Sequence, residues 1–261
     1  MKRKYGRIAD IEDDVNDWKA KFSLGSLPRQ MSLADSRPPI MDQSAAGSCV
    51  MHGIPGVIRH HLRRRYNANP TSTLYDREFS ALFGYYNGRE LEGSIQSDNG
   101  LQIRDGIKVV AQQGLASIDL WPYDLTKLYA KPPQEAYEDA VQYKIQSYSR
   151  VSVSASAIKT AIASYHPVVI GIPVYESFDN VGADGIVKMP EKGETLLGGH
   201  CMYVDGYEEV PGCFTVPNSY GPDWGHNGVC YIPYDYLGSL GSDYWVINMF
   251  GTDAAKIAGL A

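Results

Sequence analysis

One short stretch of the sequence holds several groups that a nucleophilic thiol needs. Cys49 follows Gly47 and Ser48, at the point where an extended loop gives way to a helical pattern. Unpaired N–H groups at a helix N-terminus favour an anion and lower the pKa of a thiol. Ser48 is a residue type that caps helices. We therefore predict that Cys49 is a nucleophile and that Gly47 leaves room for a peptide beside it.

Gln43, in the same loop, could complete an oxyanion hole. Its side-chain amide can return toward the start of the helix, where the backbone N–H of Cys49 is a second donor. Two fixed donors stabilise the negative charge that develops on a carbonyl oxygen under attack. Loss of one such donor typically costs on the order of 2.7–4 kcal/mol of activation free energy.

A base and its partner follow much later in the chain. His200 comes directly after Gly198 and Gly199, which leave one side of the imidazole open. We expect Gly199 to lie beside the substrate bond that the thiol attacks. Asn218 begins the stretch Asn-Ser-Tyr-Gly, and its amide oxygen can accept from an imidazole N–H and so hold the ring. We predict that His200 is the base for Cys49 and that Asn218 orients it.

Each of these residues has an ordinary structural interpretation when taken alone. A single cysteine is usually a small buried apolar residue, and an asparagine is often a turn residue. Together they favour a catalytic site, because they supply four complementary groups. Gln43 is a donor to the oxyanion, Cys49 a nucleophile, His200 a base and Asn218 a partner that orients the base. The remaining cysteines lack such neighbours and form no CxxC pair, so we expect no zinc or thioredoxin-type site and interpret them as buried strand residues: Cys201, Cys213 and Cys230.

The elements that must position these residues change in type along the chain. Helical patterns come first, over 49–66, 75–87 and 101–113. Short apolar runs bounded by Gly, Pro, Asn and Asp come later and predict strands over 168–174, 202–207, 213–216, 229–232 and 244–249. Helices followed by strands indicate an α+β fold.

Residues 1–26 differ from the rest. Apolar residues recur at helical spacing, with acidic residues mostly on the other side, so we predict an amphipathic helix: Ile8, Ile11, Val15, Trp18 and Phe22. The segment is too short to bury that stripe alone, so we expect it to dock on the remainder of the protein. The alternative is an acidic tail that does not dock.

The bulk properties exclude several classes of protein. The chain has 261 residues, of which 44% are hydrophobic and 21% charged, and its net charge is −6, which argues against a nucleic-acid surface. No run approaches the roughly 18 apolar residues of a membrane span. No signal peptide is visible, which favours the cytoplasm, although a secreted protein whose signal has been removed would look the same.

Taken together, the motifs resemble the papain family of cysteine peptidases. The resemblance covers roughly residues 27–250 and rests on the segments Gln43–Cys49, Gly198–His200, Asn218–Gly221 and Trp224–Gly228. Leu27-Pro28 resembles the usual mature start. Residues 85–105 and 120–133 resemble bacterial members that lack the long inhibitory propeptide.

This resemblance implies a papain-like two-lobed fold with the active-site cleft between the lobes. A mainly helical left lobe (27–145) would carry Cys49, and a β-barrel right lobe (146–261) would carry His200 and Asn218. The resemblance implies hydrolysis of a peptide or protein substrate through an acyl-enzyme, without metal or cofactor. Residues 1–26 would be a short prosegment that inhibits the cleft from within the same chain, as in a zymogen.

The resemblance also assigns residues that would contact the substrate. Asn99 and Gly100 would line the non-primed side, on which the acyl part of the substrate lies. Tyr220 stands where the family usually has Trp, covering the contact between His200 and Asn218. Asp243 would lie near the floor of the main specificity pocket and favour basic side chains.

Several departures from the family pattern leave alternatives open. Ala46 replaces a cysteine, so the usual neighbouring disulfide cannot form, and Val50 replaces an aromatic residue. His200 and Asn218 follow Cys49 at more than the usual separation of about 130–150 residues, which we attribute to an insertion over 179–197. The alternatives are a catalytically impaired papain-like protein that binds peptides, and an acyl transferase that uses the same residues.

Overall fold

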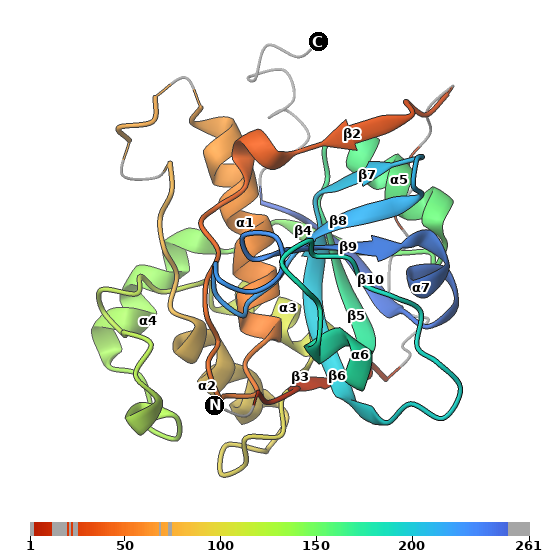
Figure 1. Ribbon diagram of the computed structural model, residues 1–261. Helices are drawn as coiled ribbons and strands as arrows, with labels where there is room; N and C mark the ends of the chain where they lie inside the picture. The colour runs from red at the N-terminus through yellow and green to blue at the C-terminus, as the bar shows by residue number, and fades with distance from the viewer. Residues whose placement is uncertain are drawn as a thin grey trace.

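The structure is a computed structural model that describes residues 3–11, 20, 22, 26–67, 69–72 and 75–249. Four helices, α1 to α4, gather on one side of the molecule, and most strands lie on the other with helices α5 to α7 (Figure 1). The predicted α+β class is confirmed. Among the described residues, no helix has the length and apolar character needed to cross a membrane.

The central helix α1 (Val50–Arg65) begins directly after Cys49. Nearly all of its residues are buried, so it packs against neighbours on most of its surface. Pro55 lies inside α1 without ending it. The other helices on this side are α2 (Ala81–Leu91), α3 (Ile103–Gln112) and α4 (Gln134–Ala140). Helix α2 begins later than the pattern over 75–87 predicts, because Ser80 caps it by accepting from the N–H of Phe83.

The strands form two four-stranded sheets and one short pair. The first sheet has the order β4-β10-β5-β6, with all its pairs antiparallel: β4 (Ser147–Val151), β10 (Ser242–Asn248), β5 (Val168–Tyr175) and β6 (Leu196–Val204). The second has the order β2-β7-β8-β9: β2 (Gln30–Ser32), β7 (Gly206–Glu208), β8 (Cys213–Pro217) and β9 (Val229–Pro233). The run predicted over 202–207 is thus two strands that meet at Asp205. Three short helices lie among these strands: α5 (Ala155–Ala163), α6 (Glu176–Asp179) and α7 (Tyr234–Ser239).

The first sheet is buried on both faces. Alternate side chains of each strand point to opposite faces. Val169, Cys201 and Trp245 pack toward α1, whereas their neighbours Val168, Met202 and Tyr244 join the core shared with the second sheet. Because β6 lies against α1, His200 at its centre is carried close to the start of that helix.

Asp205 joins β6 to the helical side through a buried ion pair. Its carboxylate accepts from Arg37 Nε at 2.6 Å and Nη2 at 2.9 Å, and it lies 3.4 Å from His60 Nε2 on α1. Burial raises the pKa of this carboxyl, but the contacts with His60 and Arg37 outweigh that effect and hold it below its usual value. The pair therefore ties the segment before Gln43 to the strand that carries His200.

The N-terminal segment departs from the predicted helix. Arg7–Ile8 form strand β1, which pairs in parallel with β3 (Leu101–Gln102). The helix prediction is wrong at Ile8, because tertiary strand pairing overrides the local apolar spacing. Val15 and Trp18 lie outside the described residues. Further along, the N–H of Ala20 donates to Arg150 O at 2.8 Å, and the Phe22 ring lies 5.1 Å from that of His166.

Candidate functional site

Cys49 lies at the N-terminus of α1 and is completely buried. The structure makes Cys49 itself the residue before the first helical turn. The prediction that Ser48 caps the helix is wrong, since its hydroxyl lies 2.7 Å from Tyr123 Oη instead. The residue before Cys49 is therefore fixed by a hydrogen bond to Tyr123, which lies in the loop over 114–124.

Gln43 is buried beside Cys49 and is fixed at both ends of its side chain. Its Nε2 donates to Ala46 O at 3.0 Å and to Lys4 O at 3.1 Å, and its Oε1 accepts from Ser219 Oγ at 2.6 Å. The backbone N–H of Gln43 also donates to Ser219 O. The loop that carries Cys49 thus meets the segment that carries Asn218, and the Gln43 amide points at a peptide carbonyl.

His200 and Asn218 form the predicted pair. His200 Nε2 donates to Asn218 Oδ1 at 2.8 Å, and the same oxygen accepts from the N–H of Ser219. In the neutral ring this leaves Nδ1 as the acceptor, and within the described part of the chain it has no hydrogen-bond partner. Tyr220 stacks on the imidazole of His200, with ring centroids 4.9 Å apart.

Cys49 and His200 are both neutral in this arrangement. Burial raises the pKa of Cys49 to about 11, opposed by hydrogen bonds from the backbone of Cys201, Gly6 and Val50. Burial also lowers the pKa of His200 to about 4, opposed by its bond to Asn218. Because burial dominates both shifts, a thiol and a neutral imidazole are favoured as long as the site is covered.

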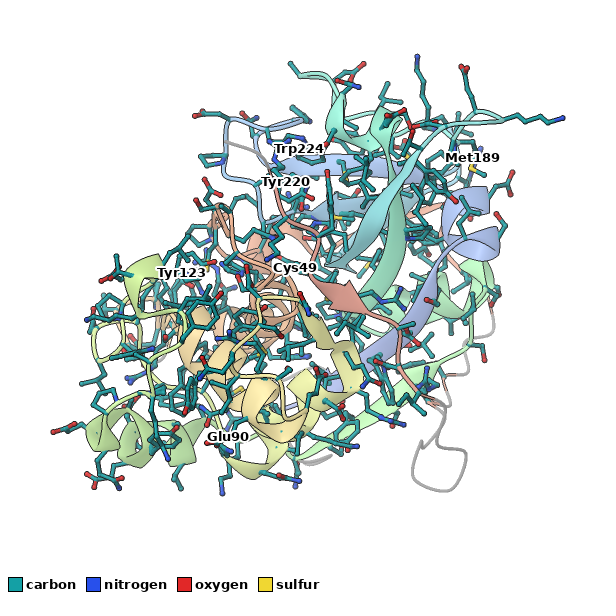
Figure 2. The ribbon with its side chains drawn as sticks, turned by 90° about the horizontal axis from the view of Figure 1, so that it is seen from below. Cys49, Glu90, Tyr123, Met189, Tyr220 and Trp224 are labelled. Carbon is teal, nitrogen blue, oxygen red and sulfur yellow. The ribbon has the colours of Figure 1, made fainter. Side chains whose placement is uncertain are left out.

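The cover is the N-terminal segment over residues 3–11, which we call the strap. Figure 2 shows Tyr220 and Trp224 together on one side of Cys49 and Tyr123 on another. The strap reaches this group, because the guanidinium of Arg3 lies over the Tyr220 ring. Gly6 lies so close that a Cβ added to it would stand 1.9 Å from Gly47 O, and one added to Gly100 would stand 1.7 Å from Gly6 O. Only a bare backbone fits between these two residues.

Hydrogen bonds and charges hold the strap in place. Gly6 O accepts from the N–H of Leu101 at 2.8 Å, and Lys4 Nζ donates to Asp98 Oδ2 at 2.8 Å. Tyr5 lies edge-on to His200 and its hydroxyl bonds Asp179. Beyond Gly6, the guanidinium of Arg7 bonds Asp243. The strap therefore has contacts on both sides of Cys49.

The predicted substrate-contact residues mostly lie along the strap. Gly47 and Gly100 flank Gly6, and Gly199 faces Arg7 O, which would stand 2.4 Å from a Cβ at that position. Tyr220 lies beneath the guanidinium of Arg3, at 4.3 Å. Asn99 is exposed beside Gly100, and among the described residues its side chain makes no hydrogen bond to the strap.

Three residues that the sequence analysis did not single out position the site. Asp98 Oδ1 accepts from the N–H of Gly47 at 2.9 Å and from Tyr85 Oη at 2.6 Å, and Tyr85 Oη accepts from the N–H of Gly100 at 3.1 Å. Tyr123 donates to Gln43 O at 2.7 Å. All three lie in the segments that resemble bacterial family members, which is the signal that could have found them.

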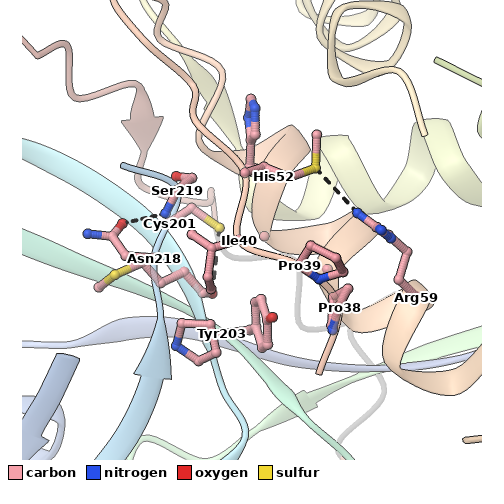
Figure 3. A pocket seen from close by; sticks show the side chains of 14 residues that line it. Pro38, Pro39, Ile40, His52, Arg59, Cys201, Tyr203, Asn218 and Ser219 are labelled. Atoms are coloured by element: carbon pink, nitrogen blue, oxygen red, sulfur yellow. Dashed lines mark hydrogen bonds between the residues drawn. The ribbon is translucent and has the colours of Figure 1, made fainter. Parts of the chain in front are cut away.

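A small, partly open pocket lies beside the site, between α1 and β6. It has a volume of about 30 Å³ and is lined by Ile40, His52, Cys201 and Asn218 among others (Figure 3). That volume suits a single water rather than a substrate. Within the part of the chain that the structure describes, no three His, Cys, Asp or Glu side chains form a group that could hold a metal ion.

Comparisons with known proteins agree with this geometry. Residues 28–241 match the sequence profile of the papain family of cysteine proteases. An uncharacterized peptidase C1-like protein of Acanthamoeba polyphaga mimivirus is 38% identical over 220 residues, which cover 80% of this chain and 69% of the viral protein.

Solved structures share the fold. The crystal structure of xylellain, a cysteine protease from Xylella fastidiosa, is 32% identical, with a TM-score of 0.84 over 96% of this chain and 99% of xylellain. Procathepsin B S9 from Trypanosoma congolense is 18% identical, with a TM-score of 0.69 over 95% of this chain and 87% of that protein. The predicted papain-like fold is confirmed.

Proposed function

The chain belongs to the papain family of cysteine proteases, and we propose that Cys49 and His200 hydrolyse peptide bonds in a cleft that the strap keeps closed. The observation that carries this proposal is the peptide seated on the site. The carbonyl of Lys4 accepts from Gln43, and the backbone of Gly6 contacts the Cys49 sulfur.

The reaction proceeds in two steps. The thiolate of Cys49 attacks the substrate carbonyl carbon, while Gln43 Nε2 and the N–H of Cys49 donate to the oxygen that becomes negative. His200, as imidazolium, protonates the leaving amine, and the C–N bond breaks to give a thioester. His200 then takes a proton from water, which attacks the thioester and releases the acid. Asn218 holds the ring throughout by accepting from Nε2.

The direction of the strap explains how it resists cleavage. The leaving amine begins the C-terminal part of a substrate and takes its proton from His200, so that part must lie on the His200 side. The strap has its N-terminal residues there, since Tyr5 lies against His200 and Arg3 over Tyr220. From Gly6 it continues the other way, alongside β3. Its chain direction is therefore opposite to that of a cleavable substrate.

The strap also keeps the reactive pair neutral. Removing it would return water to Cys49 and His200 and so remove the burial that raises one pKa and lowers the other. A thiolate beside an imidazolium then becomes favourable, and thiols activated in this way titrate well below pH 7. The strap thus opposes activity in two ways, by blocking access and by desolvation.

A single substitution in the full-length chain tests this proposal. Gly6→Ala places a Cβ against the backbone of Gly47, which cannot move cheaply, so the strap should leave the cleft. Gly238→Ala is the matched control, because a Cβ there meets nothing within 4 Å. Each 1.4 kcal/mol of lost strap affinity opens the cleft tenfold more often. We therefore expect Gly6→Ala to raise peptide hydrolysis roughly tenfold or more, and Gly238→Ala to leave it unchanged.

Labelling of Cys49 with iodoacetamide gives an independent readout. At mildly acid pH the Gly6→Ala protein should label much faster than wild type, whose covered thiol has a pKa raised to about 11. The wild-type rate should keep rising with pH up to that value, because the thiolate fraction increases tenfold for each pH unit. Equal labelling of the two proteins would refute the strap's role.

Two other outcomes would redirect the proposal. Rapid labelling of Gly6→Ala without hydrolysis of any peptide would favour a peptide-binding protein that has lost catalysis. Products joined to an added amine in preference to water would indicate acyl transfer.

A further inference from the structure

Near its end, the strap places a buried carboxylate among three donors. The Asp10 side chain is 0% exposed. Its Oδ1 accepts from the N–H of Arg104 at 3.1 Å, and its Oδ2 accepts from Trp245 Nε1 at 2.8 Å and lies 3.5 Å from Arg150 Nη2. We call these three donors the carboxylate cradle. From this arrangement we infer that the carboxylate cradle binds an acidic side chain of the substrate once the strap has left.

The backbone donor comes from the start of a helix. Arg104 is the second residue of α3, and the first N–H groups of a helix have no partner within it. Gln102, which precedes α3, makes no side-chain cap. Asp10 therefore takes the place of a cap, at the end of the helix where a negative charge is favoured.

The two side-chain donors face each other across neighbouring strands. Trp245 on β10 pairs with Arg150 on β4, and the Arg150 guanidinium lies over the indole ring, 4.4 Å from its centroid. Trp245 is completely buried, so with the strap in place its N–H depends on Asp10 as acceptor. Because α3, β4 and β10 lie outside the strap, all three donors stay in place when Asp10 leaves.

An acid suits the vacated cradle better than a neutral side chain does. A hydrogen bond to a carboxylate is roughly twice as strong as one to a neutral acceptor, and here one donor carries a full charge. Burial opposes the binding of a carboxylate, since it raises the pKa of Asp10 against the effects of Arg104, Trp245 and Arg150. We therefore expect a selectivity of moderate size. The net charge of −6 repels acidic peptides in general, so a preference for an acid has to come from these donors.

The course of the strap places the cradle on the acyl side of the cleft. Gly6 lies at Cys49, and Asp10 follows four positions further along the chain, at most about 14 Å away. The cradle is therefore a position beyond the one that Arg7 occupies next to Gly6. A substrate crosses the cleft in the opposite direction, so its acid should stand near the fifth residue before the cleaved bond. This assignment rests on the proposed hydrolysis.

Matched peptides on the full-length Gly6→Ala protein test the inference. All share one sequence and one leaving group, and aspartate or its uncharged isostere asparagine stands at the fourth, fifth or sixth residue before the cleaved bond. We expect aspartate to raise kcat/KM over asparagine by roughly 5- to 20-fold at one of these positions, and by less than about twofold at the other two. High salt should reduce the preference, because the Arg150 side chain is 20% exposed.

One substitution removes a single donor of the cradle. Trp245→Phe deletes the indole N–H and keeps an aromatic ring under Arg150, so it should bring the ratio of aspartate to asparagine close to one. Trp121→Phe is the matched control and should leave the ratio intact, because Trp121 Nε1 has no hydrogen-bond partner among the described residues. Arg150 is less suitable for substitution, since it also pairs with Asp243.

The outcomes separate this inference from the proposed function. Equal kcat/KM for aspartate and asparagine at all three positions would show that the cradle only anchors the strap, and would leave the peptidase intact. The same preference at all three positions, or one that persists in Trp245→Phe, would show that acids are recognised elsewhere. No hydrolysis of any peptide would overturn both proposals. The comparison of substrates on the Gly6→Ala protein decides the matter even where Trp245→Phe fails to fold.

Discussion

The proposed catalytic centre and the anchors of the strap are held by different contacts. Around Cys49 and His200 the contacts are neutral hydrogen bonds, from backbone N–H groups to the Cys49 sulfur and between His200 and Asn218. The strap is anchored mainly by charged groups, with Lys4 on Asp98 and Arg7 on Asp243. Neutral contacts depend little on salt, whereas the partly exposed pair of Lys4 and Asp98 is screened by it, and the buried pair of Arg7 and Asp243 is screened much less. The centre can therefore stay assembled while the cover is released.

The largest expected effect tests the neutral centre directly. On the Gly6→Ala protein, His200→Ala should lower kcat by about 10⁴-fold or more, because removing one member of a unit that acts together costs nearly as much as removing all of it. The pH dependence of Cys49 labelling should at the same time return to that of an ordinary thiol. A variant that kept the low-pH labelling would show that some other group activates the sulfur.

Asp205→Asn tests an ion pair that stabilises the fold and does not involve the strap. The carboxylate of Asp205 is completely buried and the Arg37 side chain is 21% exposed, so breaking the pair should lower the free energy of unfolding by about 3 kcal/mol, measured by urea denaturation. Since the pKa of Asp205 is lowered in the folded protein, its stabilisation is complete above the ordinary aspartate pKa and disappears as pH falls through the folded value. A variant as stable as wild type near pH 7 would contradict this role.

Gln43→Ala tests whether the Gln43 side chain donates directly to the oxyanion. It removes a donor to the oxyanion and should lower kcat by about 10²- to 10³-fold, with a smaller change in KM. Ser219→Ala is the matched control: it takes away the hydroxyl that holds Gln43 Oε1 but leaves the Nε2 donor in place. A similar loss in both variants would mean that Gln43 acts only through its position.

The smallest expected effect lies at the exposed end of the strap. The Lys4 side chain is 44% exposed, so its pair with Asp98 is screened and is worth less than about 1 kcal/mol. Lys4→Met should therefore raise peptide hydrolysis by only about two- to fivefold at low salt, and by less at high salt. An effect as large as that of Gly6→Ala would show that charge, rather than backbone fit, closes the cleft.

Local sequence predicted much of the fold. Helix α1 and strands β5, β8 and β9 lie within a residue or so of their predicted bounds, because their apolar periodicity matches the faces that they bury. Strand β4 and helix α5 were not predicted, and the run over 202–207 proved to be two strands. The N-terminal helix was wrong at Ile8, where β3 supplies a strand partner that no local pattern reveals.

The residues of the candidate site could be predicted from the sequence alone. Their neighbours in the sequence indicate their chemistry. Gln43 and Cys49 lie in a loop before a helix, His200 follows two glycines, and Asn218 begins a turn. Their catalytic roles remain predictions. Only the tertiary structure decided that Lys4 and Gly6 cover this site, that Asp98 and Tyr85 brace it, and that Arg7 reaches Asp243. These contacts join residues far apart in the chain, and their energies depend on burial and direction, which exist only after the chain has folded.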